Sequence, residues 1–359
     1  MTTVEQTTPV DQDRLMQFVF RAVGEIGATM NTALVVMGDR LGWYRALAQY
    51  GPATAAELAA RSGSELHLTR EWLNAQAAGE YVLYDPESTR YTLPPEQAVA
   101  LTDEASPVFL PGLFQIAFGT LRGAPTVIEA ASDDGAYGWD ERNTDVHEGC
   151  ERFFLPSYSA HLVTDWLPAL SGVVARLHAG ARVIDVGCGY GAATILMARA
   201  FPASRFVGTD FHAESVDAAR DRARIAGVSD RVEFRVANAD EGADGPYNLI
   251  TTFDALHDMG DPAAAARAAR RAVADDGTWL IVEPAAGDHV EDNLNPVGRA
   301  YYGFSTLLCT PSSLAQRGRA ALGTQAGPTR IREITEAAGF SGFRIAAQTP
   351  FHNVFEVTV

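Results

Sequence analysis

The stretch Val183–Phe201, VIDVGCGYGAATILMARAF, decides the fold of the second half of the chain. A short β-branched run contains an acid, Asp185, and glycines follow at alternating positions 187, 189 and 191 before a helical sequence begins. Glycine permits the sharp turn from a strand into a helix and lets a ligand approach the backbone closely. The stretch therefore predicts a strand, a cofactor-binding turn made by Gly187, Gly189 and Gly191, and a helix.

Short apolar runs continue this pattern after Gly180. Five of them are ARVIDVG, SRFVGTD, RVEFRVA, YNLITTF and GTWLIVE, and helical sequences separate most of them. Such alternation is typical of an α/β fold with a parallel, doubly wound sheet. Two further runs, GFRIAAQTP and HNVFEVTV, are separated by a turn and predict an antiparallel hairpin at the edge of the sheet.

The first hundred residues have a different pattern of apolar residues. Apolar residues recur at helical spacing from about residue 12 to 49, with one break, which predicts two helices. A short helix, a turn, a second helix and a Tyr-rich hairpin follow, in PATAAELAARSG, ELHLTREWLNAQAAGEYV and LYDPESTRYTLP. This order is typical of a winged helix.

The charge of this segment bears on whether it binds DNA. Residues 1–100 hold seven Arg against twelve Asp and Glu, and the would-be recognition helix around Leu68–Ala78 offers only Arg70. Phosphate contacts need clustered positive charge. We therefore expect a module for dimerisation and for covering the pocket, with nucleic acid not expected as a partner.

The composition of the whole chain also argues against a nucleic-acid partner. The 359-residue chain has a formal net charge of −17, and all of its basic residues are arginine, so it gains little from binding polyanions. Cys150, Cys188 and Cys309 are odd in number and widely spaced, and they are not grouped with histidines. This favours a reduced, cytoplasmic protein without disulfides or a metal site. No long apolar run or secretory leader is present, so no membrane association is expected.

Acidic and polar residues at the strand ends suggest what the glycine turn binds. A carboxylate at Asp185 suits a ligand that carries an ammonium and a sulfonium better than it suits a pyrophosphate. Asp210 ends the second strand, where it can accept hydrogen bonds from ribose hydroxyls, and Phe211 could pack on adenine. The turn after the third strand, with Asn238, Ala239 and Asp240, offers candidates for the adenine edge.

With these residues in this order, the C-terminal half strongly resembles the class I S-adenosylmethionine-dependent methyltransferases. The resemblance implies a Rossmann-like sheet of seven strands, which accounts for the terminal hairpin. It also implies S-adenosylmethionine as cofactor and S-adenosylhomocysteine as product.

The winged-helix half and the segment Ala255–Glu283, ALHDMGDPAAAARAARRAVADDGTWLIVE, narrow the resemblance to small-molecule O-methyltransferases. The run EDNLNPVGRAYYGFSTLLCTPSSLAQ is similar to actinobacterial winged-helix methyltransferases. In the O-methyltransferases a His after the fourth strand is the general base and a Glu ending the fifth strand orients it. By position, these roles fall on His257 and Glu283. Asp258 is either a second partner of the base or the cap of the helix that begins near Asp261.

The chemistry agrees with this assignment. Methyl transfer is an in-line displacement, so the enzyme must align a nucleophile and remove its proton. An imidazole is largely neutral at pH 7, and a nearby carboxylate fixes its tautomer.

Two positions depart from the family pattern. Met259 stands where the family has Trp, and the loop LGTQAGPTRIRE has Pro328 near the place of a second acid, with none before Glu333. Three alternatives therefore stay open: methylation at carbon or nitrogen, a cofactor-assisted reaction without methyl transfer, and a regulator that senses the cofactor and reads DNA.

Large apolar residues from the helices indicate the substrate class. Residues 111–119, 153–166 and 301–307 are rich in Phe, Leu, Tyr and Trp, which predicts a pocket for a hydrophobic small molecule such as a phenol or a polyketide. Tyr158 and His161 are polar-tipped residues that share one helix face. The further candidates are Phe253 and Tyr158 at the cofactor, and His161, Phe154, Tyr301 and Tyr302 at the substrate.

The predicted organisation has three parts. Residues 1–100 form the helices and winged helix that dimerise, and residues 101–178 form a helical linker that covers the pocket. Residues 179–359 form the methyltransferase domain, with a helical insertion at about 291–326. A homodimer is expected.

Overall fold

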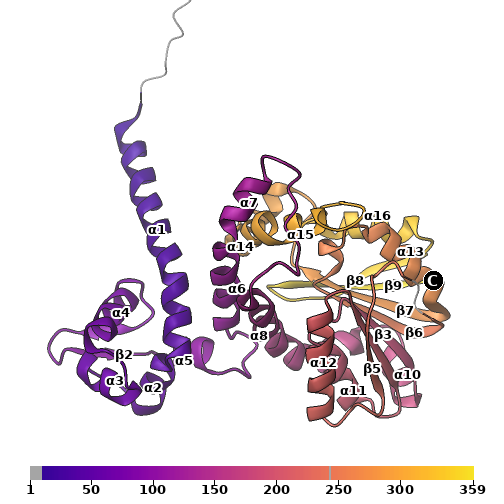
Figure 1. Cartoon of the computed structure of the whole chain (residues 1–359), viewed down its shortest axis with the longest axis horizontal. Helices are drawn as coiled ribbons and strands as arrows, with labels where there is room; N and C mark the ends of the chain where they lie inside the picture. The colour runs from indigo at the N-terminus through magenta and orange to yellow at the C-terminus, as the bar shows by residue number, and fades with distance from the viewer. Residues whose placement is uncertain (1–9, 242–243) are drawn as a thin grey trace, which may run out of the picture. The chain divides into compact units, whose positions relative to one another are not determined.

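The protein, for which we use a computed structural model, is described over residues 10–241 and 244–359. Residues 1–9, which begin the predicted first part, lie outside the described residues. The chain divides into two compact units: residues 1–103 with 109–114, and residues 104–108 with 115–359 (Figure 1). Within the described ranges, no helix has the length and apolar content that crossing a membrane requires.

The first unit contains the predicted winged helix. Its elements are α1 (Gln12–Arg40), α2 (Trp43–Tyr50), α3 (Ala55–Ser62), α4 (Leu66–Ala78), β1 (Leu83–Asp85), β2 (Arg90–Thr92) and α5 (Pro95–Thr102). The two helices predicted up to residue 49 are confirmed, and the chain breaks between them at Leu41 and Gly42, where Gly42 takes a left-handed φ of 69°. Antiparallel β1 and β2 make the wing.

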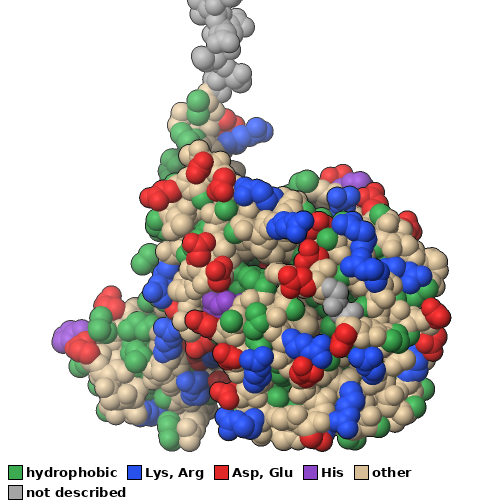
Figure 2. Space-filling model, turned by 45° about the vertical axis from the view of Figure 1, so that its right-hand side comes forward, with side chains coloured by type: hydrophobic (Ala, Val, Ile, Leu, Met, Phe, Trp, Pro, Cys, Tyr) green, Lys and Arg blue, Asp and Glu red, His purple; other side chains and the backbone are tan. Residues whose placement is uncertain are grey.

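Two tryptophans organise the core of this unit. Trp72 of α4 packs on Trp43 of α2, with ring centroids 4.8 Å apart, and its indole N–H donates to the Leu34 carbonyl of α1. A Cβ at Gly38 would fall 2.4 Å from the Trp72 ring, so α1 must carry a glycine where the ring approaches. The N-terminal part of α1 is different, because its apolar side chains are uncovered (Figure 2).

The second unit is built on the predicted sheet of seven strands. Its strands are β3 (Arg182–Val186), β4 (Arg205–Asp210), β5 (Val232–Val236), β6 (Tyr247–Phe253), β7 (Val273–Pro284), β8 (Gly342–Gln348) and β9 (His352–Thr358). They run in the order β5-β4-β3-β6-β7-β9-β8, with β3 to β7 parallel and β9 antiparallel to both neighbours. The α/β fold class and the C-terminal hairpin are confirmed.

Helices cover both faces of this sheet. The helical segments are α6 (Pro111–Arg122), α7 (Ala124–Ala130), α8 (Thr144–His161), η1 (Leu162–Trp166), α9 (Leu167–Ala169), α10 (Val173–Ala179), α11 (Ala192–Ala200), α12 (Ala213–Ile225), η2 (Leu256–Asp258), α13 (Pro262–Ala272), η3 (Val290–Asn293), α14 (Pro296–Phe304), η4 (Ser305–Cys309), α15 (Thr310–Leu314) and α16 (Gly327–Ala337). Residues of α8 to α12 pack on one face of the sheet, and residues of α13 and α16 pack on the other (Figure 1). A sheet covered in this way buries both faces of its central strands, which explains the apolar runs within β3, β6 and β7.

The strand order places the ligand site. It reverses at β3, whose neighbours are β4 and β6, and open α/β sheets bind ligands beyond the carboxyl ends of the strands at such a switch point. The connection from β5 to β6 has no helix in its described residues. A cavity of about 150 Å³ lies between the sheet and α13, and Asn238 and Ala239 of this connection line it.

We expect Trp72→Ala to destabilise the first unit by about 3–5 kcal/mol, because it empties the centre of the core. Leu68→Ala, on the same helix at a side chain that is 57% exposed, should change stability by less than about 0.5 kcal/mol. Hydrogen exchange of the α1–α4 amides measures this unit separately from the other. Equal protection in the two variants would contradict this account of the core.

Candidate active site

The glycine turn follows β3 and has the backbone that its glycines predict. Gly187, Gly189 and Gly191 have φ values of 75°, 52° and 80°, in the left-handed region that side chains disfavour. A Cβ at Gly191 would lie 2.6 Å from the Phe234 ring, whereas a Cβ at Gly189 would meet nothing within 4 Å. Gly191 is therefore required for packing, and Gly189 leaves open space on the backbone.

Asp185 lies beneath this turn and faces the protein interior. Its side chain accepts hydrogen bonds from the hydroxyls of Thr194 on α11 (2.5 Å) and Thr251 on β6 (2.9 Å), and the residue is 1% exposed. Burial raises the pKa of Asp185 to about 6, against the two threonine hydrogen bonds. The carboxylate thus ties β3, β6 and α11 together, and its contact with a ligand ammonium stays a prediction.

Asp210 at the end of β4 closes the other side of the turn. Its two carboxylate oxygens accept from the backbone N–H groups of Gly189 and His212, both at 2.9 Å. Burial raises the pKa of Asp210. Each oxygen keeps a further lone pair for a hydroxyl. Phe211 follows it with 39% of its surface exposed, so its ring is available to a ligand.

The turn after β5 lies at the rim of the cavity described above. The Asn238 side chain donates to Glu241, and Asn238, Ala239 and Met259 all line the cavity. Asp240 is exposed. Two of the three predicted adenine-edge residues thus line a hollow, and Met259 of the His257 segment lines it with them.

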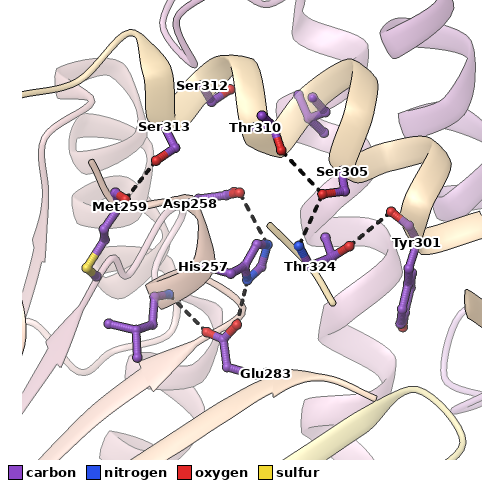
Figure 3. A network of polar contacts seen from close by, with 12 residues as sticks. His257, Asp258, Met259, Glu283, Tyr301, Ser305, Thr310, Ser312, Ser313 and Thr324 are labelled. Carbon is purple, nitrogen blue, oxygen red and sulfur yellow. Dashed lines mark hydrogen bonds and ion pairs between the residues drawn. The ribbon is translucent and has the colours of Figure 1, made fainter. Parts of the chain in front are cut away.

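His257 and Glu283 come together at the ends of β6 and β7 (Figure 3). His257 lies in the short helix η2, and its Nδ1 is 2.6 Å from Glu283 Oε2. The other carboxylate oxygen, Oε1, accepts from the Leu256 backbone N–H at 2.9 Å. Both residues are buried, with 3% and 4% exposed. Glu283 therefore fixes both the ring of His257 and the backbone that carries it.

Asp258 contacts the opposite side of the same ring. Its Oδ1 lies 3.2 Å from His257 Nε2, without the alignment of a hydrogen bond. Burial by itself lowers the pKa of His257, but the charges of Asp258 and Glu283 outweigh it and raise that pKa well above its ordinary value. The alternative that Asp258 caps the next helix is wrong, because Asp261 is the N-cap of α13 and accepts from the Ala264 N–H at 2.7 Å.

The η2 segment packs directly against the glycine turn. A Cβ at Gly187 would lie 2.7 Å from Ala255 Cβ and 4.0 Å from the end of the Met259 side chain. Any larger residue at position 187 would therefore push the two segments apart. The predicted cofactor turn and the predicted base are neighbours in space.

The aromatic candidates form a separate cluster beside β6. Tyr158 packs on Phe154 and Phe253, with ring centroids 5.8 and 5.2 Å away, and its hydroxyl donates to Asp254 Oδ2 at 2.7 Å. His352 Nε2 lies 3.3 Å from the same oxygen. Sequence reasoning missed Asp254 and His352, and the only signal for Asp254 was its place directly after a buried strand.

The remaining substrate candidates have partners of their own. His161 contacts Asp165 at 2.7 Å on its own helical segment and stacks on Trp166. The buried Tyr301 hydroxyl donates to the Phe351 carbonyl. Tyr302 is half-buried on α14. Their roles at a substrate stay predictions.

Comparison with known proteins agrees with this geometry. Residues 177–337 match a family described as "Methyltransferase domain", and residues 29–103 match one described as "Rv2258c-like winged HTH domain". The chain carries a methyltransferase domain behind a winged helix-turn-helix domain. These two matches confirm the methyltransferase domain and the winged helix that the sequence predicts.

Relatives of the chain include 27-O-demethylrifamycin SV methyltransferase of Amycolatopsis mediterranei. It is 30% identical over 198 residues, which are 55% of this chain and 56% of that protein. The aligned part thus spans about half the length of this curated relative.

Solved structures share the fold over nearly the whole chain. Mitomycin 7-O-methyltransferase is 18% identical with a TM-score of 0.69, covering 97% of this chain and 100% of its own. Human N-acetylserotonin methyltransferase in complex with S-adenosylmethionine is 15% identical with a TM-score of 0.66. The match covers 98% of this chain and 99% of the human protein. An O-methyltransferase from neocarzinostatin biosynthesis, solved with S-adenosylhomocysteine and 1,4-dihydroxy-2-naphthoic acid, is 19% identical with a TM-score of 0.59, covering 94% and 98%. These likenesses show that the chain shares the fold of these methyltransferases.

The buried Asp185 should make stability depend on pH. The pKa of Asp185 in the folded state is about 6, above its ordinary value of 3.8. The free energy of unfolding therefore falls as the pH rises from 3.8 to 6, because Asp185 ionises less readily in the folded chain than in the unfolded one. Asp185→Asn can keep both threonine partners and has no proton to lose. Relative to Asp185→Asn, the unmodified chain should lose up to about 3 kcal/mol between pH 4 and 7.

Thermal unfolding from pH 4 to 7 measures this difference, with the exposed Asp275→Asn as control. A gap between the unmodified chain and Asp185→Asn that stays constant over this range would show that Asp185 does not titrate there.

Proposed function

We propose that the chain transfers a methyl group from S-adenosylmethionine to a hydroxyl of a hydrophobic small molecule, with His257 as general base. The observation that carries this proposal is the packing of the Glu283-oriented His257 segment against the glycine turn. A base and a methyl donor must meet within a few ångströms, and this contact brings their two segments together.

The cofactor contacts would come from the turn and the strand ends. The open backbone at Gly189 would admit the donor, Asp210 would hold the ribose, and Phe211 with Asn238 and Ala239 would surround the adenine. When bound, the cofactor supplies an electrophilic methyl carbon. Gly187, Gly191 and Asp185 would act by shaping the turn.

His257 would accept the hydroxyl proton at Nε2. Asp258 contributes to the raised pKa of His257, so moving its carboxylate away from Nε2 lowers that pKa; the hydrogen bond from Nδ1–H to Glu283 then leaves the lone pair of the neutral imidazole on Nε2. The Asp258 carboxylate now lies 3.2 Å from that nitrogen, so an acceptor hydroxyl would take its place there. Asp258 supplies, from the neighbouring position, the second carboxylate that the loop around Pro328 lacks, and it would stabilise the imidazolium that forms.

The acceptor is proposed to be a phenol or a polyketide-like hydroxyl. Support comes from the apolar and aromatic side chains beside β6, including Phe154 and Phe253, and from the dihydroxynaphthoic acid in the neocarzinostatin neighbour. The three free cysteines fit a reducing cytoplasm, which we propose as its location.

A homodimer is proposed through α1. Met16, Val19, Val23, Ile26 and Met30 follow one another at spacings of three and four residues, and each is between 38% and 67% exposed. That spacing is the repeat by which two helices pack against each other. A second copy of the chain is the occupant that this stripe fits.

The base is tested with His257→Ala. We expect kcat/KM to fall by about 10²–10⁴-fold, because proton removal is lost while the cofactor turn is unchanged. Glu283→Gln should give a smaller loss, and the exposed Glu333→Gln should match the unmodified chain. The assay measures S-adenosylhomocysteine release with a set of phenols that includes 1,4-dihydroxy-2-naphthoic acid, and calorimetry measures S-adenosylhomocysteine binding.

Two outcomes would contradict the proposal in different ways. A folded His257→Ala variant that keeps most of its turnover would remove His257 as the base and favour methylation at carbon or nitrogen. A chain that binds neither S-adenosylmethionine nor S-adenosylhomocysteine would remove the cofactor assignment altogether.

The dimer is tested with the double variant Val23→Asp and Ile26→Asp. The unmodified chain should elute as a dimer, and the variant as a monomer, because two charges per helix oppose burial of the stripe. Size-exclusion chromatography with light scattering measures the mass, and Gln17→Asp, one position off the stripe, is the control. A monomeric unmodified chain would refute the dimer.

A further inference from the structure

Three side chains with different ligand atoms meet at Nε2 of His257. Among the described residues, His257, Asp258 and Cys309 each offer one ligand atom, and these atoms all lie within 4.8 Å of one another. The nitrogen and the Asp258 Oδ1 are 3.2 Å apart (Figure 3). In a tetrahedral zinc site, bonds of about 2.0–2.3 Å place the ligand atoms about 3.3–3.8 Å apart. A separation of 4.8 Å must therefore shorten by about 1 Å for the group to hold such an ion.

The surroundings of the ring complete the pattern of a metal-bound histidine. Glu283 accepts from Nδ1, which leaves Nε2 as the nitrogen free to bind. Metal-ligating histidines nearly always donate their second ring N–H to such a carboxylate or carbonyl. Asp258 Oδ1 is shielded from solvent and, within the part of the chain that is described, makes no aligned hydrogen bond; its neighbours are His257 Nε2 at 3.2 Å and the thiol of Cys309. The three side chains therefore already contact one another before any ion is bound.

Cys309 reaches this place through an irregular helix. It ends the π-helical turn η4, in the insertion after β7, and π-turns often occur at functional sites. The buried Arg142 guanidinium donates to the carbonyls of Leu307 and Leu308 and fixes the backbone just before Cys309. Its positive charge opposes a bound cation, but Asp258, Glu283 and a metal-bound Cys309 thiolate together supply three negative charges.

We propose that His257 Nε2, a carboxylate oxygen of Asp258 and Cys309 Sγ form a zinc-binding site with its fourth position open. One nitrogen, one oxygen and one sulfur suit zinc, since this set is too soft for magnesium or calcium. The Asp258 side chain is 24% exposed, so an ion can enter from that side. The inference shares His257 with the proposed function, because zinc on Nε2 occupies the lone pair of the proposed base and so inhibits methyl transfer.

Cobalt is the first probe, because a thiolate bound to Co²⁺ gives a charge-transfer band in the near ultraviolet and tetrahedral Co²⁺ absorbs in the visible. We expect both bands on adding Co²⁺ to the unmodified full-length chain, and zinc should abolish both. Cys309→Ser should lose the charge-transfer band, and Cys150→Ser should keep it. Absence of the band in the unmodified chain, or its loss in Cys150→Ser but not in Cys309→Ser, would overturn the site.

Zinc affinity is measured by competition with a chromophoric chelator. Asp258→Asn should weaken zinc binding at least about tenfold, and Glu283→Gln, which loses the support of the ring, by about 10–100-fold. Calorimetry with S-adenosylhomocysteine on each variant verifies that it is folded. Unchanged zinc affinity in Asp258→Asn and in Cys309→Ala would refute the site.

The metal measurements need no methyl acceptor, so they fail or succeed independently of the proposed function. An assay of methyl transfer with added zinc, and then with excess EDTA, tests whether zinc binding blocks the proposed base. We expect zinc to inhibit methyl transfer and EDTA to reverse the inhibition. Zinc binding without inhibition would leave the metal site standing and would contradict His257 as the base.

Discussion

The close packing of the η2 segment on the backbone of Gly187 is the constraint on which the rest of the site depends. β3 lies at the point where the strand order reverses, and its continuation must turn sharply to start α11. Left-handed glycines make the turn possible, and the missing side chain at Gly187 lets the η2 segment pack against it. Because Gly187 has no Cβ, the η2 segment that carries His257 can pack close to the turn. The absence of this atom therefore helps to set the position of His257.

Buried carboxylates hold this arrangement in place. Asp185 links β3 to β6 and α11 through two hydroxyls, Asp210 holds the turn and the start of the next loop, and Glu283 holds the ring and backbone of η2. Each carboxylate bridges segments that are distant in sequence. Burying an acid is costly unless it is hydrogen-bonded, and here the same hydrogen bonds that offset the cost also fix the geometry.

The sequence was a good guide wherever a signal is local. The glycine spacing, the apolar runs and the turn before the last strand predicted the glycine turn, the parallel sheet and its hairpin, because each is determined by a few neighbouring residues. The pairing of His257 with Glu283 could be predicted only through resemblance to a family. The approach of Cys309 could not be predicted at all: 52 positions separate it from His257, and a π-helical turn within an insertion directs it inward. The absence of a metal site was inferred from spacing along the chain, and spacing says nothing about residues that the fold brings together.

The connection from β5 to β6, which has no helix in its described residues, has a consequence for how the protein could diverge. The cavity beside it has a floor of sheet residues such as Ile184 and Trp279 and a wall made by Ala265, Ala268, Ala269 and Ala272 of α13. Alanine is the smallest side chain that a helix tolerates well. With alanine at these positions, α13 therefore fills as little of the cavity as a stable helix at this distance can. Any substitution along the wall other than glycine, which weakens a helix, shrinks the hollow. Its present volume is thus near an upper limit, and evolution at these four positions can tighten what the space accepts but cannot widen it without moving the helix.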